Sequence, residues 1–457
     1  MEQTNKPKII TRFPPSPTGF LHIGRARTAL FNFLFTRKNG GEMVFRLEDT
    51  DKERSKSEFE QDIVESLKWL GISYDQGPFR QSERTGEYQK YLKRLLESGA
   101  AYKSIEPKKE NPTENIEVVR FKNPNKKIKW NDLIRGEVEF DTTDLKDFVI
   151  ARTIDDPLYH LTVVVDDFEM GITHVLRGED HISNTPRQIL IQEAIGAPRP
   201  VYAHIPLILA PDRSKLSGRH GAVSVTEYRA MGYLPEALVN YLALLGWNPG
   251  TEQEIFSMEE LIGEFDIGAV QKGGAIFDLV KLKWINKEHI KLMPEEGFAE
   301  EVKKWLPEEI KEAAKFSTVF PKILPLLRER ISTFGELKEM AEAGEIQYFF
   351  EPPQYDPQSL LCPPKQRKGQ ELELGALKPI LEALKGLLEP LLDNFDRNFI
   401  KDTIWPYAEK QGRAVVLWAM RYALSGRDKS PDPFTLAEIL GKDETLRRLD
   451  NAISKIK

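Results

Sequence analysis

The chain has 457 residues, a formal net charge of −6 and one cysteine, Cys362. A chain of this length usually folds into more than one domain. A single cysteine excludes both an internal disulfide and a zinc site built from several cysteines. The negative net charge excludes a uniformly basic nucleic-acid coat, although a local basic surface stays compatible with it. The first ten residues lack the apolar core of a signal peptide, and no apolar run reaches membrane-spanning length. We therefore expect a soluble, cytoplasmic multidomain protein with no membrane partner.

Alternating strand and helix patterns fill the first hundred residues. Residues 8–13 read as a short buried strand, and residues 24–37 as a helix with apolar side chains three and four positions apart. Residues 43–47 predict the next strand and residues 52–70 the next helix. A further helix is expected over residues 83–98. This order favours a parallel, doubly wound sheet.

The pattern changes after Tyr102. Residues 103–147 are polar and strand-like, and the alternation of strands and helices returns at Phe148. It includes the apolar run 161–165 and a predicted helix over 185–195. From about Pro235 onward the pattern is helical. We interpret the polar segment as an insert between two halves of one sheet domain.

The turn between the first strand and the first helix predicts a phosphate site. The N-terminus of a helix that follows a strand carries free N–H groups and a positive dipole end. Prolines at 14, 15 and 17 stiffen the turn before a ligand arrives. Gly24 lets the backbone approach a ligand closely, and His22 is able to donate to a phosphate oxygen. A bare histidine-x-glycine also matches by accident, so the stretch alone leaves a plain strand-to-helix connection open.

The longer string around this turn is more specific. It resembles the N-terminal signature of class I aminoacyl-tRNA synthetases in their glutamyl form, with residues 22–25 in place of the "HIGH" element. The fourth histidine of that element is absent. Further matching stretches follow in the family's order, strongly to about residue 290 and more weakly beyond it: 46–51, 80–84, 157–167, 176–188, 215–224 and 281–286.

The resemblance implies a fold and a division into domains. We expect an α/β Rossmann-type doubly wound parallel sheet as the catalytic domain, interrupted by an inserted acceptor-binding domain and followed by an all-α anticodon-binding region. The expected boundaries are 1–100 and 151–210 for the two halves of the catalytic domain, 101–150 for the insert, 211–320 for a "KMSKS"-like loop with a helical stem-contact domain, and 321–457 for the α-helical anticodon-binding region.

Selection of glutamate requires cations for two carboxylates and an anion for the ammonium group. Arg12, Arg177 and Glu48 each stand at an expected strand end, and arginine grips a carboxylate with two bonds. Taken singly, each arginine is better explained by a surface salt bridge, and Glu48 by an acidic first helical turn. The resemblance assigns the side-chain carboxylate of glutamate to Arg12. It completes the amino-acid pocket with Ser16, Glu48, Tyr159 and Arg177.

The resemblance also implies how ATP is bound. Catalytic roles fall to His22 and to Lys215, which belongs to the mobile "KMSKS"-like loop. Gly218 stands where the family usually has its second loop lysine, so Lys215, Arg213 or Arg219 carries the phosphate charge, or activation is slow. A flexible basic loop is the alternative interpretation of the segment. The expected ATP-binding residues are Pro15, His22, Gly24, Arg25, Lys215, Ser217 and Arg219.

Two regions are expected to meet RNA. The basic run of the insert would face the acceptor end of the tRNA, although a solvated loop is an equal interpretation. The helical C-terminal region would read the anticodon, with Arg413, Arg421 and Arg427 as weaker candidates. The tRNA-binding candidates are Lys122, Lys126, Lys127, Lys129, Arg328 and Arg330.

Metal requirements follow from the resemblance and from composition. Mg²⁺ is expected to arrive with ATP, and no metal site is expected in the protein itself. Many relatives carry cysteines after the element matching Ala101-Tyr102, but this chain has none there, so no structural zinc is expected. For His160, His174, His181, His204 and His220 we favour a structural, hydrogen-bonded role.

The implied activity is that of an ATP-dependent glutamate–tRNA ligase. Glutamate would be activated to glutamyl-adenylate with release of pyrophosphate, and then transferred to the 3′ end of tRNA(Glu) with release of AMP. The alternatives are an enzyme that also charges tRNA(Gln), a weakened tRNA-binding paralogue, and a shorter tRNA-independent or tRNA-modifying glutamyl transferase. The length beyond residue 320 disfavours the last. An elongated monomer is expected.

Overall fold

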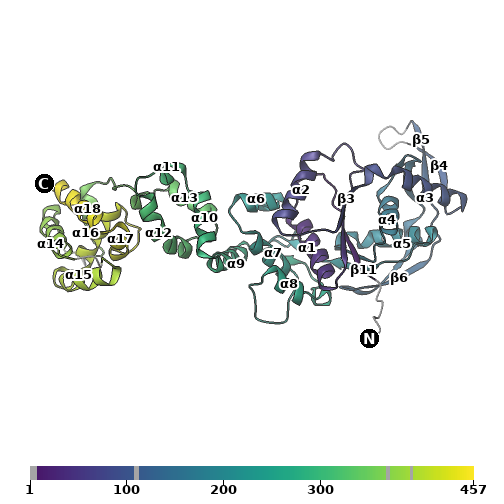
Figure 1. Cartoon of the computed structure of the whole chain (residues 1–457). Helices are drawn as coiled ribbons and strands as arrows, with labels where there is room; N and C mark the ends of the chain where they lie inside the picture. Colours follow the sequence, from purple (N-terminus) through teal and green to yellow (C-terminus); the bar gives the residue numbers. More distant parts are fainter. Residues whose placement is uncertain (1–7, 108–112, 367–370, 392–394, 457) are drawn as a thin grey trace. The chain divides into compact units, whose positions relative to one another are not determined.

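The computed structural model describes residues 8–107, 113–366, 371–391 and 395–456. Two compact units divide the chain, Met1–His289 and Ile290–Lys457. Strands and helices alternate in the first unit, and the second is helical (Figure 1). In the described part of the chain, no helix is long and apolar enough to cross a membrane.

Parallel strands form the centre of the first unit. Strands β1 (Ile10–Phe13), β2 (Glu42–Leu47) and β3 (Gln76–Arg80) pair in this order, and β10 (His174–Gly178) pairs with β11 (Val201–Ile205). The Thr173 amide donates to Ile10 O at 2.9 Å, which places the start of β10 beside β1. Strand β1 therefore lies between β2 and β10, and the chain reverses its direction of winding there. Ligands bind at the carboxyl edge of such a switch point.

Five helices accompany these strands: α1 (Ile23–Lys38), α2 (Ser57–Trp69), α3 (Thr85–Glu97), α4 (Tyr159–Glu169) and α5 (Thr185–Ile195). The predicted helix over 185–195 is confirmed residue for residue, and that over 24–37 within one residue at each end. The prediction that the second helix begins at residue 52 is wrong. Ser55 and Lys56 donate instead to Asp51 O and Pro17 O, so the chain turns there and α2 begins at Ser57.

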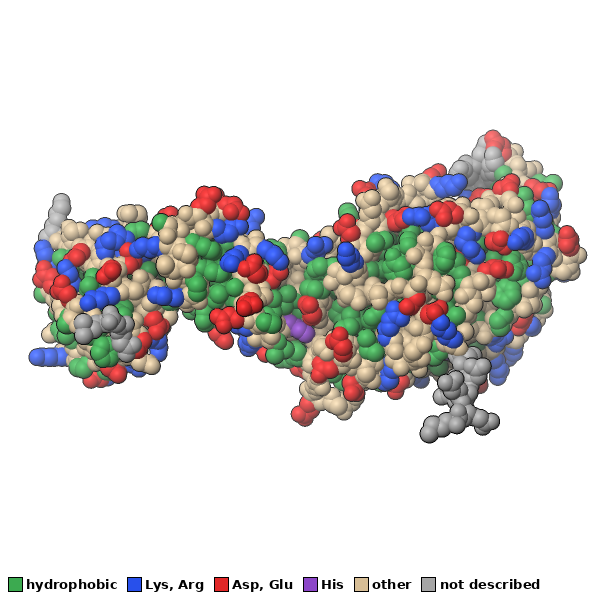
Figure 2. Space-filling view, in the orientation of Figure 1, with side chains coloured by type: hydrophobic (Ala, Val, Ile, Leu, Met, Phe, Trp, Pro, Cys, Tyr) green, Lys and Arg blue, Asp and Glu red, His purple; other side chains and the backbone are tan. Residues whose placement is uncertain are grey.

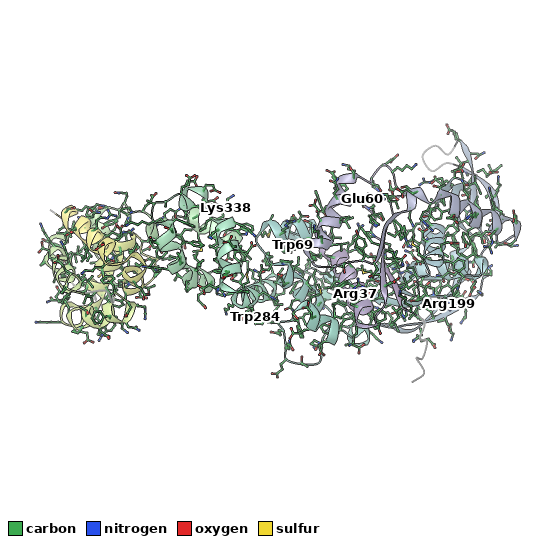
Figure 3. The ribbon with its side chains drawn as sticks, in the orientation of Figure 1. Arg37, Glu60, Trp69, Arg199, Trp284 and Lys338 are labelled. Carbon is green, nitrogen blue, oxygen red and sulfur yellow. The ribbon has the colours of Figure 1, made fainter. Side chains whose placement is uncertain are left out.

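The predicted insert is made of antiparallel strands. Strands β4 (Ala101–Pro107), β5 (Asn115–Phe121), β8 (Phe148–Thr153) and β9 (Asp156–Pro157) form one sheet. The hairpin of β6 (Lys127–Asp132) and β7 (Gly136–Asp141) instead joins β11, where Tyr202 pairs with Asp132. Arg199, labelled in Figure 3, donates to Lys129 O at 2.8 Å and secures this hairpin. The hairpin thus continues the β10–β11 sheet, while the five domain ranges stay predictions.

The remainder of the first unit holds α6 (Val225–Ala230), α7 (Pro235–Leu244) and α8 (Met258–Glu264), together with the short parallel pair β12 (Ile208–Leu209) and β13 (Ala275–Ile276). Helices α7 and α8 pack against α1, and α6 contacts α2. Ala26, Leu30 and Leu34 of α1 are fully buried in the cluster that includes Leu238 and Leu242 of α7. A second cluster joins α3, α4 and α5, and the apolar run 161–165 lies buried within α4.

The second unit is built from helices, as predicted for the C-terminal region. Helix α9 (Leu279–Leu292) covers the division between the units, and no strand is assigned among the residues of the second unit that the structure describes. Its further helices are α10 (Glu295–Trp305), α11 (Glu308–Lys311), α12 (Phe316–Arg330), α13 (Gly335–Glu342), α14 (Lys378–Leu388), α15 (Arg397–Gln411), α16 (Arg413–Ser425), α17 (Pro433–Leu440) and α18 (Lys442–Lys455). On the face shown in Figure 2, acidic and basic side chains are interspersed over both units.

Candidate active site

Strand ends bring the predicted glutamate-binding residues to one edge of the sheet. Arg12 lies in β1, Arg177 in β10, and Glu48 directly follows β2. Tyr159 begins α4. Arg12 and Arg177 are 2% and 5% exposed, so their charges stand largely out of water. Burying a cation in this way is costly unless a partner or a ligand compensates it.

Arg12 is compensated by acids that the sequence analysis did not select. Its Nε lies 3.4 Å from both carboxylate oxygens of Asp167, and Arg46 approaches the same carboxylate at 2.9 Å. Asp166 accepts from Arg84 Nε at 2.7 Å, and the carboxylates at 166 and 167 both come from α4. The long contacts to Asp167 leave Arg12 loosely held, which suits a side chain that exchanges one carboxylate for another.

Arg177 has a different environment. It donates from Nε to His204 Nε2 at 3.2 Å, and from its two terminal nitrogens to Gln188 Oε1 and Thr185 Oγ1, each at 2.7 Å. All three partners are neutral acceptors, and within the described ranges no carboxylate lies within salt-bridge distance of this guanidinium. A guanidinium has five N–H groups, so two remain for a ligand. The site thus holds a buried positive charge that a carboxylate ligand would neutralise.

Glu48 supplies the matching anion. Its carboxylate lies 3.5 Å from Arg46, and Oε1 is buried without a hydrogen-bond partner. Burial raises the pKa of Glu48 to about 7, against the attraction of Arg46 and Arg12. Burial and the neighbouring Glu48 charge also raise the pKa of Tyr159 to about 12, so its hydroxyl keeps its proton. An unsatisfied carboxylate oxygen beside two arginines is a suitable partner for an ammonium group.

The turn before α1 is built as the sequence predicts. His22 caps the helix, because its Nδ1 accepts from the Gly24 amide at 3.0 Å. Burial, followed by the charges of Arg25 and Lys215, lowers the pKa of His22. Its ring is therefore neutral, with Nε2 as the protonated nitrogen, and presents one N–H donor outward. The carbonyl of buried Pro15 accepts from the Glu48 amide at 3.0 Å, and Ser16 O accepts from Arg25. The first bond ties the turn before α1 to the end of β2, and the second ties the turn to α1.

The basic loop after β12 lies near His22. Isolated bridge pairing joins His22 to Ser224, and the charge of Lys215 reaches the His22 ring. Lys215 Nζ lies 3.1 Å from the carboxylate of Asp180. Arg219 donates to Ser214 Oγ, and Ser217 precedes a short turn of helix. All seven predicted ATP-binding residues therefore belong to the turn before α1, to the first turn of α1 or to this loop.

Three of the four predicted tRNA-binding lysines of the insert form ion pairs within the chain. Lys126 pairs with Glu193, while Lys127 and Lys129 share Glu139. Lys122 is exposed. Their role toward RNA stays a prediction.

Arg328 and Arg330, the two candidates in α12, also have partners. Arg328 donates to Met293 O at 2.7 Å and stacks over Phe298 at 4.4 Å, and Arg330 pairs with Glu345. Their assignment to the anticodon stays a prediction as well.

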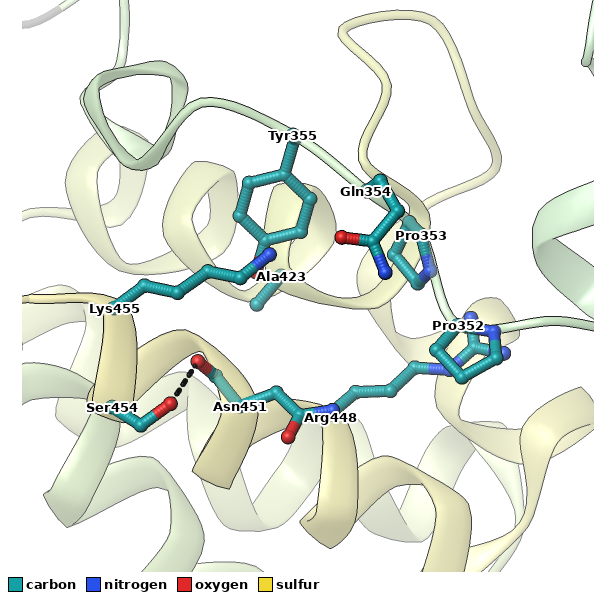
Figure 4. A pocket seen from close by; sticks show the side chains of 9 residues that line it. All are labelled: Pro352, Pro353, Gln354, Tyr355, Ala423, Arg448, Asn451, Ser454 and Lys455. Atoms are coloured by element: carbon teal, nitrogen blue, oxygen red, sulfur yellow. Dashed lines mark hydrogen bonds between the residues drawn. The ribbon is translucent and has the colours of Figure 1, made fainter.

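A cavity of about 190 Å³ opens in the second unit (Figure 4). Lys455 Nζ stands 4.2 Å from the ring centre of Tyr355 at one side of it. Arg448 closes the other side, but its donors are already used by backbone carbonyls and Glu444. The lining residues are Pro352, Pro353, Gln354, Tyr355, Ala423, Arg448, Asn451, Ser454 and Lys455.

In the ranges that the structure describes, no three His, Cys, Asp or Glu side chains gather as metal ligands would. The expectation that the chain holds no structural zinc stays a prediction.

Sequence reasoning missed several residues of the site. Asp166 and Asp167 were read only as part of a motif, and Asp132 was not singled out. Their signal in the sequence is weak, because each meets its partner across a long separation. Asp132 contacts His204 across 72 positions, and Arg12 contacts Asp167 across 155. Only an acidic pair inside an apolar helical run hints that the carboxylates at 166 and 167 are buried.

Family models match almost the whole chain. The model for "tRNA synthetases class I (E and Q), catalytic domain" matches residues 8–115 and 105–284. The model for "Anticodon binding domain" matches residues 297–453. The second match lies within the helical unit, as expected for an anticodon-binding region.

Curated relatives and solved structures agree with these models. Glutamate–tRNA ligases from Nitrosospira multiformis and Carboxydothermus hydrogenoformans are 40% and 41% identical, and each alignment covers 97% of this chain and 99% of the relative. The crystal structure of a glutamate tRNA ligase from Elizabethkingia meningosepticum in complex with its amino acid superposes with a TM-score of 0.86 at 32% identity, covering 98% of this chain and all of that one. The glutamate–tRNA synthetase structure from Elizabethkingia anophelis gives 0.84. These matches agree with the strand-end pocket and the capped helix turn. They show that the chain belongs to the glutamate–tRNA ligase family of class I aminoacyl-tRNA synthetases.

Proposed function

We propose that the pocket at the carboxyl edge of the sheet binds L-glutamate beside ATP, and that the chain joins glutamate to the 3′ end of tRNA(Glu). The observation that carries this proposal is Arg177, a buried cation whose three hydrogen-bond partners are all neutral. Such a charge is stabilised when a carboxylate completes it. Arg12 binds the side-chain carboxylate, Glu48 binds the ammonium group, and Tyr159 and Ser16 complete the pocket.

The proposed first step forms glutamyl-adenylate. The α-carboxylate of glutamate attacks the α-phosphorus of ATP, which arrives as its Mg²⁺ complex, and pyrophosphate leaves. Pro15, Gly24 and Arg25 position the nucleotide at the turn before α1. His22 Nε2–H donates to a phosphate oxygen, and Lys215 adds a positive charge as negative charge develops there. Ser217 and Arg219 belong to the same loop. No protein nucleophile takes part, so positioning and charge stabilisation supply the rate.

The proposed second step transfers glutamate to RNA. The terminal ribose hydroxyl of the tRNA attacks the acyl carbon of the adenylate, and AMP leaves. Lys122, Lys126, Lys127 and Lys129 are the proposed contacts to the acceptor end, and Arg328 and Arg330 those in the helical unit. A cytoplasmic location and a monomeric state remain predictions.

Charge accounts for the selection of glutamate over glutamine. Glutamine would leave a buried guanidinium facing a neutral amide. Losing a hydrogen bond to a charged group costs about 1.5–3 kcal/mol, which corresponds to roughly tenfold to hundredfold discrimination.

The test combines two assays on the full chain. ATP–pyrophosphate exchange with glutamate, with and without tRNA, reports adenylate formation, and charging of purified tRNA(Glu) and tRNA(Gln) with labelled glutamate reports transfer. We expect charging of tRNA(Glu) and a glutamate KM that rises about tenfold to hundredfold in Arg177→Lys, because lysine cannot reproduce the fork. Arg152→Lys, at an exposed ion pair, is the matched control. Binding of tRNA without exchange under either condition would instead identify a weakened paralogue.

A further inference from the structure

A chain of buried hydrogen bonds reaches Arg177 from the predicted insert. The carboxylate oxygen Oδ2 of Asp132 lies 2.5 Å from His204 Nδ1, and His204 Nε2 lies 3.2 Å from Arg177 Nε. Asp132 ends β6, His204 lies in β11 and Arg177 in β10. Asp132 and His204 are 2% and 0% exposed, so water does not compete for these bonds.

The network assigns one tautomer to the His204 ring. Arg177 Nε carries a fixed proton, so the imidazole nitrogen facing it must be an acceptor. His204 Nε2 is therefore unprotonated, and Nδ1–H donates to Asp132 Oδ2. Burial lowers the pKa of His204, although Asp132 opposes this, and the ring stays neutral. A carboxylate is the partner that fixes this tautomer, because it only accepts.

The other oxygen of Asp132 anchors the carboxylate to the backbone. Oδ1 accepts from the amides of Ile134 and Arg135 at 3.0 Å each, and from the His204 amide at 3.1 Å. These three donors fix which oxygen faces the ring. Among the residues that the structure describes, the imidazole is the one hydrogen-bond partner of Oδ2. The backbone amides at Oδ1 therefore orient the carboxylate, and a substitution that alters only Oδ2 leaves these bonds in place.

We infer that Asp132 and His204 are positioning residues for glutamate, holding the Arg177 guanidinium in the orientation that leaves two N–H groups for the substrate. This inference rests on the proposed function of Arg177. Gln188 and Thr185 hold the two terminal nitrogens, and the bond from Nε to His204 is the third anchor, at the base of the fork. Both side chains are buried, and the proposed function gives neither a contact with substrate, so each acts through Arg177.

Asp132→Asn tests the inference with no change of shape. The asparagine oxygen takes the three backbone amides, and its NH₂ group then faces His204 Nδ1. The ring must respond by moving its proton to Nε2, where two N–H groups would oppose each other. We expect the KM for glutamate to rise about tenfold or more, while the KM for ATP changes less than about threefold. Asp141→Asn, which also alters an aspartate that accepts a backbone amide in the same hairpin, is the control and should leave the glutamate KM unchanged.

A second background separates positioning from a structural role. In His204→Gln, the glutamine side-chain oxygen accepts the bond from Arg177. Glutamine has no alternative tautomers, so Asp132 is not needed to select one. In this background Asp132→Asn should no longer change the glutamate KM. An unchanged glutamate KM in the single variant Asp132→Asn would overturn the inference, and so would an equal rise in both backgrounds.

NMR of the unmodified protein reads the His204 tautomer directly, without a kinetic assay. NMR of the ring nitrogens, in protein made with isotope-labelled histidine and assigned by comparison with His204→Gln, should find Nδ1 protonated and Nε2 unprotonated. The opposite pattern would overturn the inference. If the unmodified chain forms no adenylate at all, the proposed function itself fails. Normal activity with an insensitive Asp132→Asn variant rejects only the positioning role.

Discussion

Lys215 Nζ lies 3.1 Å from the carboxylate of Asp180, so the basic loop is held to the segment that follows β10. The two side chains are 64% and 45% exposed. An ion pair this open to solvent contributes about 1 kcal/mol or less. The lysine is therefore free to leave Asp180 when a phosphate offers more charge.

The first prediction follows from this weak pair. Lys215→Met should slow ATP–pyrophosphate exchange about a hundredfold, because one charged donor at the reacting phosphate is lost. Asp180→Asn should change the rate less than about fivefold, since it removes only the exposed pair. Lys90→Met, at an exposed pair in α3, serves as the control. Equal losses from Lys215→Met and Asp180→Asn would contradict this account.

Glu48 predicts a pH dependence of glutamate binding. Its pKa of about 7 means that the free site holds a proton that the substrate ammonium must displace. Affinity should therefore tighten as the pH rises from about 6 to about 8, with release of a proton on binding. Calorimetric titration in buffers of different ionisation enthalpy measures that proton. Glu48→Gln should bind weakly with no such slope, and Glu117→Gln, at an exposed pair with Lys103, should behave like the unmodified chain.

The same shift has a consequence for stability. Because the folded pKa of Glu48 is raised, the folded state keeps a proton that the unfolded chain loses between about pH 4.5 and about pH 7. The contribution of Glu48 to stability is full at the acidic end of this window and is lost as the pH rises through it. The midpoint of thermal unfolding of Glu48→Gln, relative to the unmodified chain, should therefore increase across the window. A constant difference would argue against a proton on Glu48.

Gly218 predicts a gain of activity. A Cβ built at this position meets no heavy atom within 4 Å, so the backbone there has room for a side chain to begin. Gly218→Lys would supply the second lysine that glutamate–tRNA ligases usually have in this loop. We expect the rate of ATP–pyrophosphate exchange to rise about tenfold. Gly263→Lys, at an equally open glycine in α8, is the control for added charge. A rate unaltered by Gly218→Lys would mean that the loop's existing cations already suffice.

Glu444 predicts the stability of the helical unit. Burial alone would raise its pKa, but hydrogen bonds from Arg447, Lys315 and Arg448 reverse this and lower the pKa to about 2. Removing one partner of a buried ion pair costs about 3 kcal/mol or more, so Glu444→Gln should lose at least that in urea unfolding. Because the folded pKa is depressed, the loss should shrink as the pH falls from about 4.5 towards about 2. Glu409→Gln, at an exposed pair with Arg413, should cost less than about 1 kcal/mol. A similar cost for both variants would refute the assignment.

The opening segment was predictable because its determinants are local. Apolar spacing of three and four residues fixed α1 to within one residue of each end, and a strand, a proline-stiffened turn and a capping histidine stand next to one another in the chain. The start of α2 was not predictable in the same way. The Lys56 amide donates to the carbonyl of Pro17, which is distant in the sequence, and this bond delays the start of the helix. Helix propensity reflects local sequence and does not predict such a long-range bond.

The sequence by itself determined the motifs that carry the family resemblance, and it placed arginines and an acid at successive strand ends that a parallel sheet brings to one edge. Through that resemblance it predicted a pocket for a dicarboxylic amino acid beside a nucleotide. Tertiary structure decided how each charge is compensated. Arg12 and Arg46 share Asp167, whereas Arg177 meets only neutral acceptors, and one of these is set by Asp132 from a distant hairpin. Such differences arise from contacts between segments far apart in the chain, and the electrostatic energy of a buried charge depends on those contacts rather than on its neighbours in sequence.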